Sequence, residues 1–157
     1  MKKIAVYIHI PFCDHKCIYC DFYSITPTEN VIHFITALKT EIINNKSFFA
    51  GSEISSIFFG GGTPSLLTAK QIGEILNSFY KYYNVSNNAE ITLETNPGTV
   101  DLAKLKSFKQ SGINRLSIGV QSLDDKELKF LTRIHDKKLA TETVLSGSEA
   151  GFENINL

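Results

Sequence analysis

The chain has 157 residues, of which 43% are hydrophobic and 20% are charged, and its formal net charge is zero. This composition is typical of a globular domain with its own core, and it gives no sign of binding to nucleic acid or to a strongly anionic surface. No apolar stretch is long enough to span a bilayer, so we expect at most a peripheral membrane contact. His9 and Pro11 interrupt the apolar run near the N-terminus, which argues against a signal peptide and for a cytoplasmic location.

Strands and helices are predicted to alternate along the chain. The strands are short apolar runs of the kind found in buried parallel sheets. The clearest helix has a capping box formed by Thr68 and Gln71, and Gly112 is expected to end the following helix. The predicted strands are residues 4–10, 54–59, 90–95, 114–120 and a fifth from 153 onward. The predicted helices are residues 29–46, 68–83, 101–111 and a segment from about 123 to 151 that is interrupted near 133–136.

Alternation of this kind predicts an α/β fold, with a parallel sheet and helices outside it. Two closures are compatible with the pattern, an open doubly wound sheet and a barrel, and periodicity does not separate them. The chain ends inside the fifth predicted strand, so we expect it to be the N-terminal portion of a longer protein.

The three cysteines of the chain are Cys13, Cys17 and Cys20, and they fall within eight residues. An odd, clustered set disfavours a disulfide framework and favours a reducing compartment. Three thiolates this close can hold a [4Fe–4S] cluster in which one iron stays open for a small molecule. Two alternatives remain: a zinc site that takes His9 or His15 as its fourth ligand, and a redox pair formed by Cys17 and Cys20.

The loops after the next three predicted strands also carry candidate ligand-binding residues. The glycine-rich segment 60–64 lets the backbone approach a ligand closely but lacks the P-loop pattern, and its alternative is a tight turn. Glu94 ends the third strand, and a carboxylate buried there is costly unless it has a partner, which favours a ligand-binding role. The alternative is that Glu94 is an exposed acidic residue of the loop. Gln121 follows the fourth strand, and Arg133 offers a fork for a carboxylate or, alternatively, a surface salt bridge.

The cysteine spacing C-x3-C-x2-C after an apolar strand resembles that of the radical S-adenosylmethionine (SAM) superfamily. The preceding residues, Tyr7-Ile-His-Ile-Pro-Phe, are similar to the branch that contains the heme chaperones and the oxygen-independent coproporphyrinogen III oxidases. The resemblance covers essentially the whole chain. It implies a partial (β/α)6 barrel, of which residues 1–157 would be the N-terminal part of the radical SAM core domain, truncated after about four and a half βα units.

The resemblance also implies roles for individual residues. Cys13, Cys17 and Cys20 would hold the [4Fe–4S] cluster. The residues that match SAM-binding positions are Tyr7, Tyr19, Gly61, Gly62, Thr63, Glu94, Gln121 and Arg133. In the family, the reduced cluster cleaves SAM, and the radical so formed abstracts hydrogen from a substrate; an electron donor is therefore an implied partner.

Two functions of different classes agree with the resemblance. A heme chaperone would bind heme as cargo and pass it to apoproteins, whereas an oxidase would decarboxylate coproporphyrinogen III. The oxidase pattern has a further cysteine where this chain has Phe22, and it has an N-terminal extension before the motif that starts here at Tyr7. Both features favour the chaperone and leave open whether the chain is an enzyme. A zinc-binding module is a weaker third reading, and the residues that contact heme or porphyrin are expected to lie outside this chain.

Overall fold

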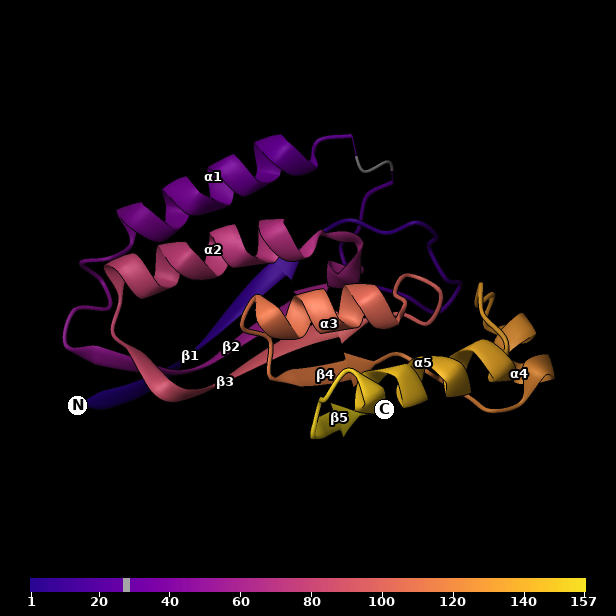
Figure 1. The fold of residues 1–157 in the computed structure, drawn as a ribbon. Coiled ribbons are helices and arrows are strands. Elements are labelled where there is room, and N and C mark those ends of the chain that lie inside the picture. The colour runs from indigo at the N-terminus through magenta and orange to yellow at the C-terminus, as the bar shows by residue number, and fades with distance from the viewer. Residues whose placement is uncertain (27–28) are drawn as a thin grey trace.

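The computed structural model of the protein describes residues 1–26 and 29–157 (Figure 1). These residues contain five strands, five α-helices and one short 3-10 turn, and strands alternate with helices except that two helices follow β4. The strands are β1 (Lys2–Ile10), β2 (Ser52–Gly61), β3 (Val85–Thr95), β4 (Arg115–Ile118) and β5 (Asn154–Asn156). The helices are α1 (Val31–Asn44), α2 (Ala69–Tyr82), α3 (Leu102–Gln110), α4 (Asp125–Phe130) and α5 (Lys137–Glu149), and the turn η1 spans Pro64–Leu66.

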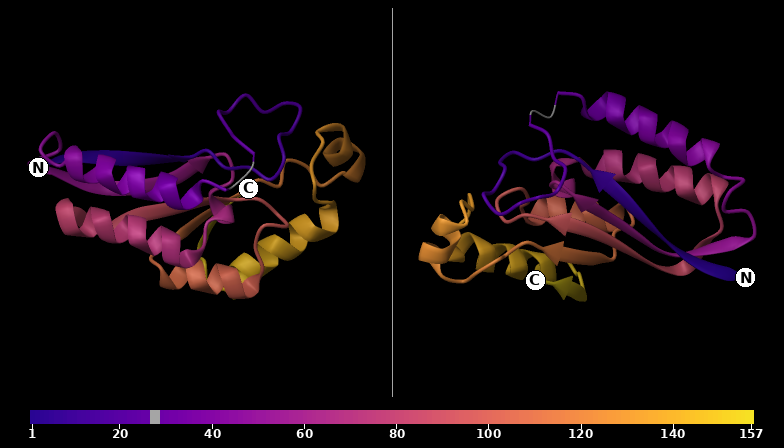
Figure 2. Two further views of the ribbon diagram at one scale, coloured as in Figure 1. Left: turned by 90° about the horizontal axis from the view of Figure 1, so that it is seen from above. Right: turned by 180° about the vertical axis from the view of Figure 1, so that it is seen from behind.

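The five strands form one parallel sheet in the order β1-β2-β3-β4-β5. Figure 2 shows that α1, α2, α3 and α5 lie on the same face of this sheet. A doubly wound sheet has helices on both faces and reverses its strand order at a switch point, and neither feature occurs in the part of the chain that the structure describes. The winding is therefore that of a partial barrel, which confirms the fold class that the family resemblance predicts.

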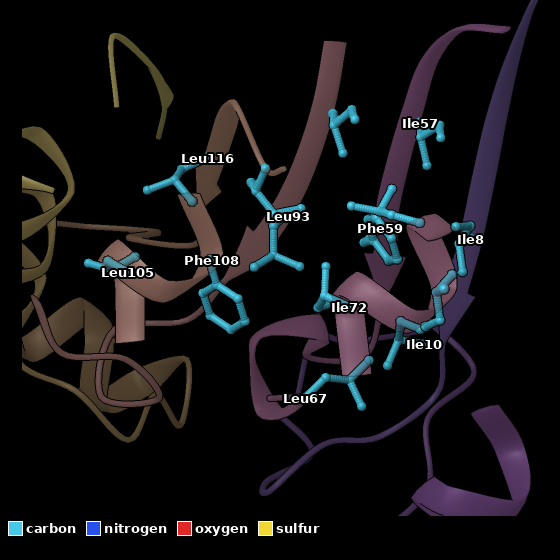
Figure 3. Close-up of a cluster of buried hydrophobic side chains, with 14 of the residues drawn as sticks. Ile8, Ile10, Ile57, Phe59, Leu67, Ile72, Leu93, Leu105, Phe108 and Leu116 are labelled. Carbon is cyan, nitrogen blue, oxygen red and sulfur yellow. The ribbon is translucent and has the colours of Figure 1, made fainter. Parts of the chain in front are cut away.

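The core lies between the sheet and the helices (Figure 3). Alternate residues of the strands point into it: Ile8 and Ile10 of β1 are buried, whereas Tyr7, which precedes Ile8, is 53% exposed on the helix-free face. Ile72 of α2 and Phe108 of α3 cover the strands from the other side and are fully buried. The core fixes the register of the sheet, because a slip by one residue would turn these side chains to the opposite face.

Two predicted helix signals are confirmed. In α2, the Gln71 backbone amide donates to Thr68 Oγ1 (3.2 Å), and the Thr68 amide donates to the Gln71 side chain (2.8 Å). Gly112 follows α3 with a φ of 109°, a conformation that a residue with a Cβ rarely adopts.

Several helix and strand boundaries differ from the predicted ones. α1 begins at Val31 and ends at Asn44, inside the predicted 29–46. β3 starts at Val85 rather than at 90, because Val85 pairs with Ile54 before a register shift and the ladder resumes at Glu90. β4 ends at Ile118 rather than at 120, because the chain then makes a tight turn in which the Val120 amide donates to the Ile118 carbonyl (2.8 Å).

The segment after β4 contains two helices with the predicted interruption between them. α4 is capped by Asp124, whose carboxylate accepts from the backbone amides of Lys126 (2.7 Å) and Glu127 (3.4 Å). Asp136 caps α5 in the same way through the Leu139 amide (2.8 Å). Within the described residues, no helix is both long enough and apolar enough to cross a membrane.

Candidate functional site

A cavity of about 680 Å³ opens at the carboxyl ends of β1 to β4. This is the edge at which parallel α/β sheets carry their functional groups. The loop after β1 lies at this end of the sheet beside α4 (Figure 2). All but one of the predicted site residues line the cavity: Cys13, Cys17, Tyr19, Cys20, Gly61, Gly62, Thr63, Glu94, Gln121 and Arg133.

Tyr7 is the predicted residue that does not line this cavity. It lies on the helix-free face of β1, where its ring stacks on Phe58 with centroids 6.0 Å apart and abuts Gly60. The pKa of its hydroxyl is raised by burial and, to a smaller extent, by the charge of Glu94. Tyr7 therefore lies beside the site, near Glu94, rather than in its wall.

The loop that carries the cysteines is fixed at both ends. The Cys13 amide donates to the Ile25 carbonyl (3.1 Å), and the Ile25 amide donates to the Pro11 carbonyl (2.7 Å). Farther along, the Ile18 amide donates to Thr132 Oγ1 (3.1 Å), which attaches the loop to the turn between α4 and α5. Thr132 has a φ of 55°, which is unusual for a β-branched residue, and such strain tends to occur at functional sites.

The three thiols are not joined in disulfides: Cys13 is buried, and Cys17 and Cys20 are half-buried. Among the described residues, no three His, Cys, Asp or Glu side chains converge closely enough to hold a single metal ion. The thiols are instead spread around the cavity wall, with Cys13 Sγ 3.5 Å from Thr63 Oγ1 and Cys17 Sγ 3.6 Å from Arg133 Nη1. Three soft sulfur donors around a cavity of this size fit an iron–sulfur cluster, which offers a separate iron to each thiolate.

The glycine-rich loop after β2 is bound closely to the end of β1. The Gly62 amide donates to the Ile10 carbonyl and the Thr63 amide donates to the Phe12 carbonyl, both at 2.7 Å. A Cβ on Gly62 would lie 2.5 Å from the Phe12 oxygen and 3.0 Å from Cys13 Sγ. Only glycine allows the backbone to approach the cysteine loop this closely.

Glu94 is half-buried at the end of β3, and its Oε2 accepts from the Gly61 amide (3.1 Å). Burial raises the pKa of the carboxyl above its ordinary value of 4.5, and the Gly61 hydrogen bond and the nearby His9 oppose this only in part. A carboxylate that is partly desolvated and lacks a full counter-charge is suited to bind a polar or cationic ligand group.

The raised pKa gives a stability prediction for Glu94→Gln in cofactor-free protein. The folded state binds this proton more tightly than the unfolded chain does, so stability is lost as pH rises from 4.5 through the folded pKa. The Gln variant avoids that loss, and its free energy of unfolding should exceed the wild-type value at pH 7 by a margin that shrinks below pH 4.5. Denaturant titrations at both pH values measure this, with exposed Glu153→Gln as control. A Glu94→Gln variant that is less stable at pH 7 would contradict the prediction.

Arg133 joins the cysteine loop to the ends of β3 and β4. Its Nη2 donates to Asn96 Oδ1 and to the Gly119 carbonyl, both at 2.9 Å. Its Nη1 donates to Tyr19 Oη (3.2 Å) and faces Cys17 Sγ. The remaining donor, Nε, is buried without a hydrogen-bond partner among the described residues. A buried donor of this kind is costly unless a ligand supplies an acceptor.

Gln121 has a φ of 67°, so the backbone after β4 is strained next to the cavity. His135 supports this segment: its Nε2 lies 3.1 Å from the Val120 carbonyl, which can only accept, so Nε2 carries the proton. Burial lowers the pKa of His135 and keeps the ring neutral. His135 thus fixes the peptide that precedes Gln121.

The comparison with known proteins identifies the family. Residues 7–157 match the radical SAM superfamily. The chain belongs to this superfamily. Membership implies a [4Fe–4S] cluster and SAM as cofactors, and the thiols, the close-packed glycine loop and the unpartnered Arg133 donor are compatible with both.

Curated members of the radical SAM superfamily that resemble this chain include heme chaperones. The heme chaperone HemW of Haemophilus influenzae is 38% identical over 163 residues, covering 100% of this chain and 43% of the relative. HemW of Escherichia coli is 38% identical over 159 residues, covering 100% and 42%. HemW of Bacillus subtilis is 37% identical over 155 residues, covering 98% and 41%. The chain therefore spans about two fifths of the length of these relatives.

Two solved structures share the fold of this chain. The coproporphyrinogen III oxidase HemN of Escherichia coli, described as a radical SAM enzyme, superimposes with a TM-score of 0.88 at 29% identity, covering 98% of this chain and 36% of that one. The hydrogenase maturase HydG of Carboxydothermus hydrogenoformans has a TM-score of 0.63 at 15% identity, which shows a shared fold alone.

Three site residues were not predicted from the sequence: Asn96, Thr132 and His135. Asn96 lies in the segment after β3 from which only Glu94 was selected, and a short polar side chain following a buried strand was an available signal. Thr132 and His135 gave no comparable signal, because their contacts depend on how the turn between α4 and α5 folds back onto the loops.

Proposed function

We propose that this chain is part of a heme chaperone, in which a [4Fe–4S] cluster and SAM accompany heme binding and transfer to apoproteins. The observation that carries the proposal is one cavity that brings three thiols together with Arg133 and Glu94. It is supported by relatives at 36–43% identity that are named heme chaperones. Residues 1–157 would form the N-terminal part of the radical SAM core domain.

In this proposal Cys13, Cys17 and Cys20 are the cluster ligands. SAM would contact the residues that share the cavity with them, namely Tyr19, Gly61, Gly62, Thr63, Glu94, Gln121 and Arg133, with Tyr7 at its border. The chain's own contribution is binding and orientation: Arg133 offers a guanidinium fork to a carboxylate, and Glu94 accepts from an ammonium group. When bound, the cluster and SAM supply one-electron chemistry, which requires an electron donor as partner.

A second candidate function is oxygen-independent coproporphyrinogen III oxidation. The superposition on HemN favours it, since the shared fold at 29% identity supports related chemistry. Against it stands Phe22, which is 60% exposed and lines the cavity at the position where the oxidase pattern has a cysteine. An exposed aromatic ring at this place offers an apolar surface for a porphyrin rather than a further thiol.

Anaerobic reconstitution of the full-length protein tests the two functions side by side. We expect heme added to the reconstituted protein to give a saturable Soret absorbance change, and coproporphyrinogen III to remain unconverted in the presence of SAM and a strong reductant. HemN from Escherichia coli serves as the positive control for conversion. Turnover of coproporphyrinogen, or rescue of heme synthesis in cells that lack both oxidases, would overturn the chaperone assignment in favour of the oxidase.

A further inference from the structure

The side-chain amide of Asn96 joins Thr63 of the glycine-rich loop to Arg133 of the turn between α4 and α5. Its Oδ1 accepts from Arg133 Nη2 at 2.9 Å, and its Nδ2 donates to Thr63 Oγ1 at 3.1 Å. Beyond these partners lie two thiols, because Thr63 Oγ1 is 3.5 Å from Cys13 Sγ and Arg133 Nη1 is 3.6 Å from Cys17 Sγ. One amide therefore connects Cys13 and Cys17 through a continuous chain of polar contacts.

The direction of the hydrogen bonds in this chain is fixed by Arg133. A guanidinium can only donate, so the Asn96 atom that faces it has to be the oxygen. Asn96 therefore presents its NH2 group to Thr63, whose hydroxyl oxygen accepts. The hydroxyl proton of Thr63 remains available, and the acceptor within reach is Cys13 Sγ. Arg133 in this way makes Thr63 a donor to the sulfur of Cys13.

The surroundings of Asn96 are close-packed and buried. A Cβ on Gly119 would lie 2.8 Å from Asn96 Oδ1, so a glycine at this point of the chain admits the amide. Thr63 is 4% exposed and Cys13 is 7% exposed, so water does not compete readily for the hydroxyl proton. A hydrogen bond in such a buried place is held in one geometry.

We propose that Asn96 is a positioning residue that directs a hydrogen bond from Thr63 to the Cys13 sulfur and holds Arg133 for SAM. The inference rests on the proposed function, in which Cys13 ligates the cluster and Arg133 binds SAM. Hydrogen bonds to cluster sulfurs are among the factors that set the reduction potential. A donor directed at Cys13 stabilises the more negative, reduced cluster and raises its potential.

The test uses the full-length protein, reconstituted anaerobically, with two separate readouts. The midpoint potential of the cluster is measured by redox titration without SAM, and SAM affinity by equilibrium dialysis. Thr63→Val removes the hydroxyl and should make the potential more negative. Thr63→Ser keeps the hydroxyl and should retain the wild-type potential. Asn96→Asp has no donor, so Thr63 would donate to the new carboxylate and the potential should also become more negative.

A double variant separates this relay from a simple effect of the added charge. If Asn96→Asp acts through Thr63, combining it with Thr63→Val should shift the potential no further than Thr63→Val does alone. Asn96→Ala, which removes one of the acceptors that hold Arg133 Nη2, should weaken SAM binding by about tenfold to a hundredfold. Asn114→Ala is the matched control. The Asn114 amide likewise bridges two partners, the backbone amide of Ile91 (2.7 Å) and the carbonyl of Ala89 (2.8 Å), but it does so at the opposite end of the sheet. That variant should keep both the potential and the SAM affinity.

The outcomes distinguish the inference from the function on which it rests. A wild-type protein that takes up no iron and binds no SAM would overturn both. If the wild type takes up both, two results would overturn the relay alone. One is a Thr63→Val variant with the wild-type potential, and the other is fully additive shifts in the double variant. Should Asn96→Ala not fold, Thr63→Val and Thr63→Ser still decide the question.

Discussion

Replacing Cys13, Cys17 or Cys20 by Ala, one at a time, is expected to abolish the iron–sulfur cluster of the full-length protein. The wild type, purified anaerobically, should be brown and contain about four irons and a matching amount of sulfide, as a cubane cluster requires. Residues 1–157 contain no further cysteine that could take the place of a lost ligand. Each variant should therefore bind close to no iron, which iron and sulfide analysis and the visible absorbance measure.

The control for these variants lies in the same loop. Asp14 is exposed next to Cys13 and carries no thiol, so Asp14→Ala perturbs the loop and should keep the wild-type iron content. Secondary structure of the Cys17 and Cys20 variants, followed by circular dichroism, should stay as in the wild type, because both are half-buried loop residues outside the core. A wild type with stoichiometric zinc and no sulfide would refute the cluster and favour the zinc alternative.

Much of the fold could be predicted because its signals are local. The apolar runs of β1, β2 and β4, the capping box of α2 and Gly112 after α3 depend on neighbouring residues, and the structure has them where the sequence indicates. The first half of β3 could not be predicted. Its residues Ser86, Asn87 and Asn88 have low strand propensity, and they lie in a register break of the β2–β3 ladder, which pairs Val85 with Ile54 and resumes at Glu90.

The location of the site could also be predicted, since the carboxyl ends of parallel strands meet at one edge whatever the details of the loops. The contacts within the site could not. The hydrogen bond between Ile18 and Thr132 joins residues 114 positions apart, and it requires a left-handed backbone at a threonine. Tyr7 shows the converse: its place on β1 is as predicted, but its ring packs over Gly60 and away from the cavity.

Gly62→Ala is expected to have the largest effect of any methyl-sized change at the site. The new Cβ would lie 2.5 Å from the Phe12 carbonyl oxygen and 3.0 Å from the Ile10 oxygen, and both contacts are with backbone that cannot rotate away. Relief requires the glycine loop to separate from the end of β1, which breaks the hydrogen bonds from Gly62 and Thr63. Overpacking costs about 1–3 kcal/mol, and each lost hydrogen bond adds about 1 kcal/mol.

The separation also moves Cys13 away from Thr63, so cluster content and SAM affinity should fall together with stability. Gly73→Ala is the matched control, because Gly73 lies inside α2 and the nearest atom to its added Cβ is Ser111 Cβ at 3.9 Å. There the methyl group has space and favours the helix, so stability should rise by up to about 1 kcal/mol with iron content unchanged. Denaturant unfolding and iron analysis of both variants measure the contrast. A Gly62→Ala protein with wild-type stability and iron content would mean that the glycine loop does not hold the cysteine loop in place.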